Sequence, residues 1–188
     1  MTKTEIISRL TSGNENFIKD KLNSENQDSA RRKTQLEGQD PFAIILSCAD
    51  SRIVPELIFD TGIGELFVVR VAGNVANTSS IASIEYAVAH LGTQIIVVLS
   101  HESCGAVTAA VKGGDNGYNM NHLLAHIAPA IVESGNNTTV NEVAKKNAML
   151  TAQNLETQST IITDAVNSGK LNIVSAYYHL ETGRVDFL

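Results

Sequence analysis

Two cysteines and a histidine stand directly after two short apolar segments of the chain. Cys48 follows the run from Phe42 to Ser47, and His101 and Cys104, spaced as His-x-x-Cys, follow the run QIIVVLS at 94–100. Both runs are too short for a helix and suit strands that are covered on both faces. Because open α/β sheets build their sites beyond the carboxyl ends of such strands, the three side chains converge if the two strands are neighbours.

Two thiolates and one imidazole form a donor set that suits Zn²⁺. Three protein ligands leave one tetrahedral position for water or substrate, as in catalytic zinc sites, whereas a structural site has a fourth Cys or His. The chain has no third cysteine, but its other histidines could serve in principle: His90, His122, His126 and His179. Cys104 also precedes a predicted helix, whose positive end favours the thiolate that a metal needs.

An aspartate and an arginine follow Cys48 at alternate positions. In an extended segment, alternation places Cys48, Asp50 and Arg52 on one side of the backbone. Asp50 can then occupy the fourth metal position itself, or Arg52 can hold it off so that it accepts a hydrogen bond from metal-bound water. Arg52 suits the second role, since a guanidinium binds a carboxylate through two bonds at once.

The elements that must position these residues alternate between strands and helices. Predicted strands lie at 42–47, 65–71, 94–100, 171–178 and 183–188, and predicted helices at 6–22, 79–92, 104–114, 120–132 and 140–167. This alternation predicts an α/β fold with a mostly parallel β-sheet flanked by helices. We expect a single domain over 1–188, with a helical arm at 1–38 and a zinc-binding core at 39–188.

The composition is that of one ordinary globular domain of 188 residues, with 43% hydrophobic and 18% charged residues. A formal net charge of −6 and the lack of a long basic stretch argue against nucleic acid or a membrane surface as partner. No apolar run is long enough to cross a bilayer, and the N-terminus lacks a secretory pattern. We therefore expect a cytoplasmic protein, in which cysteines remain thiols.

Two motifs in this order resemble those of the β-class carbonic anhydrases. CADSRIVPELIFDTGIGELFVVRVAGNVA, from Cys48, carries Cys-x-Asp-x-Arg; SIEYAVAHLG follows; and VVLSHESCGAV carries His-x-x-Cys. The likeness runs from about Gln39 to Ala110. The closing YYHLETGRVDFL resembles the last strands of the family.

The resemblance implies a carbonate dehydratase, a lyase that reversibly hydrates carbon dioxide to bicarbonate and a proton by means of zinc-bound hydroxide. One Zn²⁺ per subunit would be bound by Cys48, His101 and Cys104, with Asp50 and Arg52 as the catalytic dyad. Two thiolates donate more charge to zinc than two imidazoles do, which makes the metal a weaker acidifier of its water. We therefore expect an activity that rises on the alkaline side of neutral pH.

The resemblance also implies a homodimer or homotetramer whose N-terminal helical arm packs on the dimer partner. By position, Gln39, Phe67, Tyr86 and Gly105 correspond to residues that line the small substrate pocket of the family. Some of these residues would be contributed across the subunit interface. Carbon dioxide is apolar, so an apolar wall and one donor are enough to bind it.

Some members of the family close the site at low pH, when the counterpart of Asp50 itself becomes a metal ligand. A bicarbonate pocket of a Trp, an Arg and a Tyr supports that closed form. Here the Arg would be Arg70 and the Tyr would be Tyr177 or Tyr178, but Ile45 stands at the place of the Trp. Because the chain has no tryptophan, we expect the pocket to be incomplete and the site to rest open.

Two other functions remain open. The same fold and zinc could hydrolyse carbonyl sulfide or carbon disulfide, as close relatives of the family do, and the width of the pocket would decide between the substrates. Alternatively, the chain could be a catalytically silent zinc-binding homologue with a fourth fixed protein ligand. The intact Asp-x-Arg pair argues against a silent site, because such a site has no need to hold a carboxylate off the metal.

Overall fold

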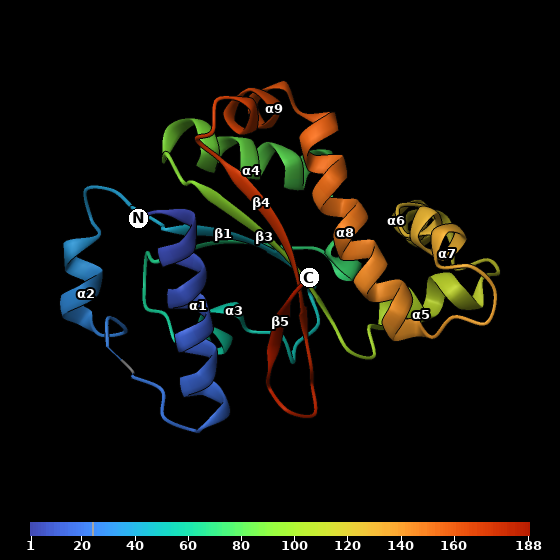
Figure 1. The fold of residues 1–188 in the computed structure, drawn as a ribbon, viewed down its shortest axis with the longest axis horizontal. Helices are drawn as coiled ribbons and strands as arrows, with labels where there is room; N and C mark the ends of the chain where they lie inside the picture. The colour runs from blue at the N-terminus through green and yellow to red at the C-terminus, as the bar shows by residue number, and fades with distance from the viewer. Residues whose placement is uncertain (24) are drawn as a thin grey trace.

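A mostly parallel β-sheet forms the centre of this computed structural model, which describes residues 1–23 and 25–188 (Figure 1). Within those residues the sheet has five strands in the order β2-β1-β3-β4-β5. The strands are β1 (Ala43–Ser47), β2 (Leu66–Arg70), β3 (Ile95–His101), β4 (Asn172–Tyr178) and β5 (Val185–Phe187). The first four run parallel and β5 returns antiparallel to β4. The predicted α/β fold is confirmed.

Strands β1 and β3 are neighbours, so their carboxyl ends lie side by side. The register pairs Ser47 of β1 with Leu99 of β3. Every residue of both strands is buried, which explains why each segment is an unbroken apolar run in the sequence. Cys48, one residue beyond β1, and His101, the last residue of β3, therefore lie at the same edge of the sheet.

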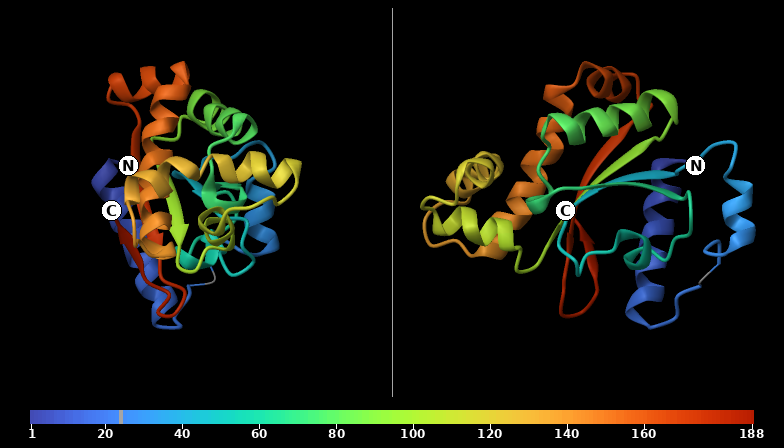
Figure 2. Two further views of the ribbon diagram at one scale, coloured as in Figure 1. Left: turned by 90° about the vertical axis from the view of Figure 1, so that its right-hand side faces the viewer. Right: turned by 180° about the vertical axis from the view of Figure 1, so that it is seen from behind.

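Helices cover both faces of the sheet (Figure 1 and Figure 2). They are α1 (Lys3–Ile18), α2 (Ser29–Thr34), α3 (Pro55–Ile58), α4 (Thr78–His90), α5 (Gly105–Lys112), α6 (Tyr118–Ala125), α7 (Ala128–Ser134), α8 (Val140–Gln158) and α9 (Thr160–Asn167), with a 3₁₀ turn η1 (Ala72–Asn74). Alternate residues of β1 serve the two faces, as the pleat requires. Ile45 packs with α1 and α3, whereas Ile44 and Leu46 pack with α4, α8 and α9.

Two of the helices predicted from the sequence are divided in the structure. The segment 120–132 forms α6 and α7, because Pro129 has no N–H to donate to the carbonyl of Ala125 and so cannot continue α6. The segment 140–167 forms α8 and α9, which meet at Ser159. Ser159 has extended backbone (φ −134°), and its Oγ accepts a hydrogen bond from the N–H of Ile162 at 3.2 Å, which caps α9.

Helix α1 packs on the sheet of its own chain. Thr2 and Glu5 form a capping box at its start, and Ile6 and Leu10 are buried in the same cluster as Ile45. The predicted packing of the 1–38 arm on a partner stays a prediction. Among the described residues, no helix combines the length and the apolar character that a membrane span needs.

Candidate metal centre

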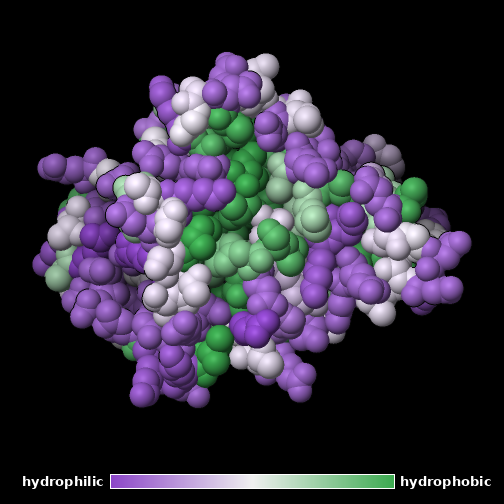
Figure 3. All heavy atoms as spheres, viewed as in Figure 1, coloured by the Kyte–Doolittle hydropathy of each residue, from purple (hydrophilic) through white to green (hydrophobic). Residues whose placement is uncertain are grey.

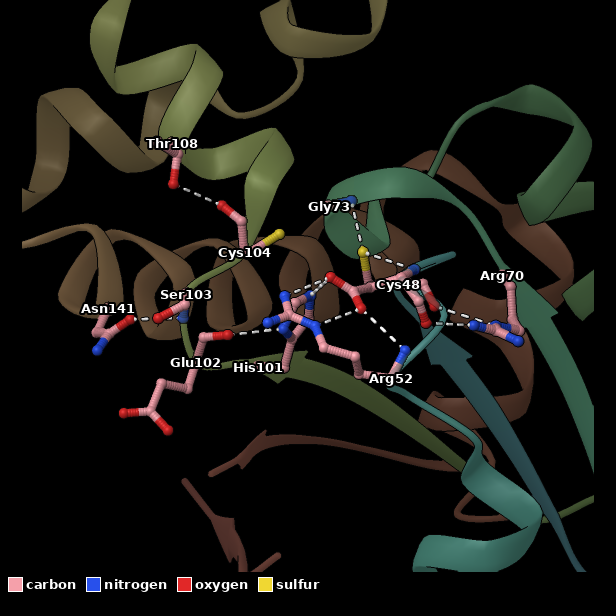
Figure 4. A network of polar contacts seen from close by, with 11 residues as sticks. Cys48, Arg52, Arg70, Gly73, His101, Glu102, Ser103, Cys104, Thr108 and Asn141 are labelled. Atoms are coloured by element: carbon pink, nitrogen blue, oxygen red, sulfur yellow. Dashed lines mark hydrogen bonds and ion pairs between the residues drawn. The ribbon is translucent and has the colours of Figure 1, made fainter. Parts of the chain in front are cut away.

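The side chains of Cys48, His101 and Cys104 converge beyond the carboxyl ends of β1 and β3. Their ligand atoms all lie within 4.8 Å of one another, and all three residues are buried. Figure 4 shows Cys48 beneath the turn at Gly73 and Cys104 at the start of α5. The convergence expected if β1 and β3 are neighbours is therefore confirmed.

The hydrogen bond of the His101 ring determines which nitrogen can bind a metal. Nδ1 lies 2.8 Å from the carbonyl oxygen of Glu102, and because a carbonyl only accepts, Nδ1 must carry the proton. Nε2 then has a free lone pair, and it is buried without a hydrogen-bond partner among the described residues. A metal-binding histidine is held in this way by a carbonyl on its other nitrogen, so the residues fit a metal ion.

The two thiols differ in how readily they ionise. Hydrogen bonding from Cys104 lowers the pKa of Cys48 to about 4, helped by the amides of Gly73 and Asp50, while burial opposes the shift. For Cys104, the hydrogen bond to Cys48 and burial both raise the pKa. A divalent cation would favour the second thiolate as well, because it replaces the shared proton.

Asp50 lies beside the cluster and is held by Arg52. The Nε and Nη2 groups of Arg52 donate to the two carboxylate oxygens of Asp50 at 2.9 and 2.7 Å. These bonds hold the pKa of Asp50 well below its ordinary range. Oδ2 of Asp50 lies 4.0 Å from Nε2 of His101. The carboxylate is thus adjacent to the three ligand atoms while its own orientation is set by Arg52.

The turn at η1 and the end of β2 hold the loop that carries Cys48. Gly73 has a left-handed backbone (φ 69°), and its N–H donates to Sγ of Cys48 at 3.3 Å. Arg70 donates from Nε to the carbonyl of Cys48 at 3.1 Å and from Nη2 to the carbonyl of Asp50 at 2.6 Å. Gly73 was not among the residues predicted for the site, although a glycine shortly after a strand is a signal for such a turn.

Comparison with known proteins identifies the family. A family model described as "Carbonic anhydrase" matches residues 43–185, more than half of the chain. The chain belongs to the carbonic anhydrase family. Carbonic anhydrase 2 of Mycobacterium tuberculosis is 36% identical over 181 residues, covering 93% of this chain and 87% of that protein.

Solved structures place the chain in the β class of the carbonic anhydrases. The β-carbonic anhydrase CcaA matches with a TM-score of 0.79 at 25% identity, covering 98% of this chain and 92% of that one. A tetrameric β-carbonic anhydrase of Sordaria macrospora has the same fold, with a TM-score of 0.77 at 22% identity, covering 98% and 97% of the two chains. The resemblance stated from the sequence is confirmed.

The residues predicted to line a substrate pocket fall into two groups in a single chain of this carbonic anhydrase. Gly105 follows Cys104 directly, at the first position of α5. Gln39 and Tyr86 instead line an open hollow whose walls include none of the three metal-cluster residues. The rings of Phe67 and Tyr86 lie 6.4 Å apart, centroid to centroid. The predicted contribution of such residues across a subunit interface stays a prediction.

The residues discussed for a bicarbonate pocket have other surroundings. Ile45 is buried between the sheet and α1, in the same cluster as Tyr178. Tyr177 packs in the cluster that contains Cys48 and Cys104. The guanidinium of Arg70 donates to two loop carbonyls. An incomplete bicarbonate pocket stays a prediction.

The four remaining histidines lie outside the three-residue metal group. His90 stacks near Tyr86, with ring centroids 5.2 Å apart. His122 and His126 pair with each other at the end of α6, and His179 contacts Asp186 through Nε2 at 2.8 Å. Within the described residues, none of them supplies the fourth ligand of a closed structural site.

Proposed function

We propose that the chain is a zinc-dependent carbonic anhydrase that reversibly hydrates carbon dioxide to bicarbonate and a proton. The observation that carries the proposal is the buried Cys48-His101-Cys104 cluster, with the unpaired Nε2 of His101 in it and an Arg-held carboxylate at its edge. Family membership and relatives named carbonic anhydrase support the same reaction.

Cys48, His101 and Cys104 would hold one zinc ion per subunit. When bound, zinc supplies a water whose pKa is lowered towards neutral, which makes a nucleophile available. The two buried sulfurs and Nε2 would supply three ligands, which leaves room for a water on the metal. Asp50 lies beside these atoms, with its Oδ2 4.0 Å from Nε2 of His101.

Asp50 orients the nucleophile and does not store its proton. Because Arg52 keeps the pKa of Asp50 well below its ordinary range, the carboxylate is ionised throughout the neutral range and acts as a hydrogen-bond acceptor. Oδ2 of Asp50 would accept a hydrogen bond from the nucleophilic water and so restrict its orientation beside the three ligand atoms. The two bonds from Arg52 also disfavour movement of the carboxylate onto the metal, which supports the open form of the site.

A second copy of the chain is the proposed partner, as homodimer or homotetramer. Strand β2 lies at the edge of the sheet, and its apolar residues Leu66 to Val69 are all partly exposed. Figure 3 shows further apolar side chains gathered over β4, between α1 and α8. Unpaired edges and apolar patches of this kind are usually covered. A partner would also bring Gln39, Phe67 and Tyr86 of one subunit towards the cluster of the other, and sedimentation velocity tests the assembly.

We also propose the cytoplasm as the location, since a reducing compartment keeps both cysteines available as ligands. The division into an arm at 1–38 and a core at 39–188 belongs to the same proposal, with the arm contacting the partner.

Stopped-flow hydration of carbon dioxide with a pH indicator tests the function. We expect zinc-loaded protein to turn over rapidly, with a rate that rises on the alkaline side of neutral. Asp50→Asn, which has the same shape but a weaker acceptor, should lose roughly 100-fold in kcat at unchanged zinc content. A flat pH profile would contradict the acidification argument. Hydrolysis of carbonyl sulfide without hydration of carbon dioxide would favour the sulfur-substrate enzyme, and neither activity would favour a silent zinc protein.

A further inference from the structure

Two side-chain amides of helix α8 hold the two loops that carry the metal ligands. Asn147 hydrogen-bonds to Gly73, in the turn that contacts Cys48. Asn141 hydrogen-bonds to Ser103, in the loop between His101 and Cys104. One rigid helix thus reaches both sides of the cluster.

Asn147 acts on Cys48 through Gly73. It is only 2% exposed, and its Nδ2 donates to the carbonyl of Gly73 at 2.8 Å. The N–H of the same Gly73 donates to Sγ of Cys48 at 3.3 Å. Gly73 adopts a left-handed conformation (φ 69°, ψ 17°), and a bond to its carbonyl restrains ψ. A buried amide from a distant part of the sequence therefore anchors the residue whose N–H contacts the sulfur.

Asn141 acts in the same way on the other loop. The N–H of Ser103 donates to Oδ1 of Asn141 at 2.9 Å (Figure 4). Ser103 also has a left-handed backbone, with φ 52°, a conformation that costs a non-glycine residue free energy unless its surroundings hold it. Ser103 is the residue directly before Cys104, so this bond sets the approach of Cys104 to the cluster.

We propose that Asn147, assisted by Asn141, is a positioning residue of the metal site, which holds the two ligand loops at the separation that zinc requires. This inference rests on the zinc site of the proposed function. Both bonds end on a residue that contacts or adjoins a cysteine ligand. Loss of a partner bonded directly to a ligand typically costs 10- to 100-fold in metal affinity, and these two asparagines act one residue further out.

Zinc affinity, measured by competition with a chromophoric chelator, is the direct test. We expect Asn147→Leu, which keeps the approximate volume without the donor, to bind zinc ~10-fold more weakly or worse, and Asn141→Ala, at a more exposed bond, to lose several-fold. The matched control is Leu155→Val, a change to a fully buried residue of the same helix that faces the other core cluster. It should lower the Tm and leave zinc affinity unchanged.

Thermal unfolding with and without zinc separates positioning from general stability. A positioning role predicts that Asn147→Leu reduces the increase in Tm that zinc produces. If Asn147→Leu lowers the Tm equally with and without zinc and binds zinc with native affinity, the inference is overturned. If Asn147→Leu does not fold, Asn141→Ala decides: a several-fold loss of affinity supports the proposal and native affinity overturns it.

The spectrum of the cobalt-substituted protein gives a readout at the ligands themselves. We expect Asn147→Leu to shift or weaken the thiolate-to-cobalt absorption, and Leu155→Val to leave it unchanged. Failure of the native protein to bind zinc would overturn the proposed function together with this inference. Native zinc binding that neither asparagine substitution alters would overturn the inference alone.

Discussion

Substitution of Gly73 by alanine should damage both stability and metal binding. Gly73 has φ 69°, and an L-residue in the left-handed region costs roughly 1–2 kcal/mol. A Cβ added there would lie 2.9 Å from Cδ1 of Ile127 and 3.3 Å from Cβ of Ala106. The end of the Ile127 side chain can move, but Ala106 is part of α5, so we add overpacking of about 1 kcal/mol, the low end of its usual range.

The control is Gly169→Ala. Gly169 has φ 71° and nothing within 4 Å of an added Cβ, and the N–H of Lys170 donates to the carbonyl of Ala165 across it, as at a left-handed helix end. Both variants therefore have similar backbone strain and a similar change in the entropy of the unfolded chain. The difference in stability between them reports the crowding of the added Cβ at position 73. At about 2–4 °C per kcal/mol for this chain length, Gly73→Ala should lower the Tm by roughly 4–12 °C and Gly169→Ala by roughly 2–8 °C.

Calorimetry of the metal-free proteins and a zinc competition assay check this pair. Gly73→Ala should be the less stable of the two variants. Its zinc affinity should fall ~10-fold, because the N–H of residue 73 that donates to Sγ of Cys48 is displaced. Gly169→Ala should bind zinc like the native protein. Equal Tm values and equal zinc affinities for the two variants would refute the role assigned to the turn.

Three further predictions concern the charges and the metal. Arg52→Leu should lower kcat and let the pKa of Asp50 rise towards its ordinary value. The control is Arg184→Leu, which breaks a similar two-bond contact to Asp186 away from the cluster. This control should leave kcat unchanged. Since its folded pKa is depressed, Asp50 contributes stability that is fully present above about pH 4, the usual Asp pKa, and is lost as pH falls below it. The Tm difference between native protein and Asp50→Asn should therefore narrow below that pH, and a constant difference would contradict the assignment. Removal of zinc by chelation should lower the free energy of unfolding by about 2.7 kcal/mol, compared with protein in free zinc at 100 times its Kd. This corresponds to a decrease of roughly 5–11 °C in Tm. An unchanged Tm would argue against a metal at the cluster.

The core of the site could be predicted from the ends of two strands, on the one condition that these strands are neighbours in the sheet. Cys48 and His101 follow unbroken apolar runs, and parallel neighbours end at the same edge of a sheet. Local signals of this kind need no knowledge of side-chain packing. The spacing of Asp50 and Arg52 likewise predicted the contact between their side chains, which the structure contains.

Contacts between distant segments were not accessible in the same way. Asn147 lies 74 positions from Gly73, and an asparagine inside a helical pattern does not indicate what its amide will contact. The break at Ser159 was missed because helical periodicity continues across it, and only the cap on Ile162 marks the new start. Gln39 and Tyr86 came from family positions, and a single chain leaves them apart from the cluster.

The most direct test of the proposed function is the rate of carbon dioxide hydration as zinc is titrated into metal-free protein. We predict a linear rise up to one zinc per chain and a plateau beyond it, as expected if Cys48, His101 and Cys104 form the one catalytic metal site. Hydration that remains at the uncatalysed rate with one zinc bound per chain would contradict the account.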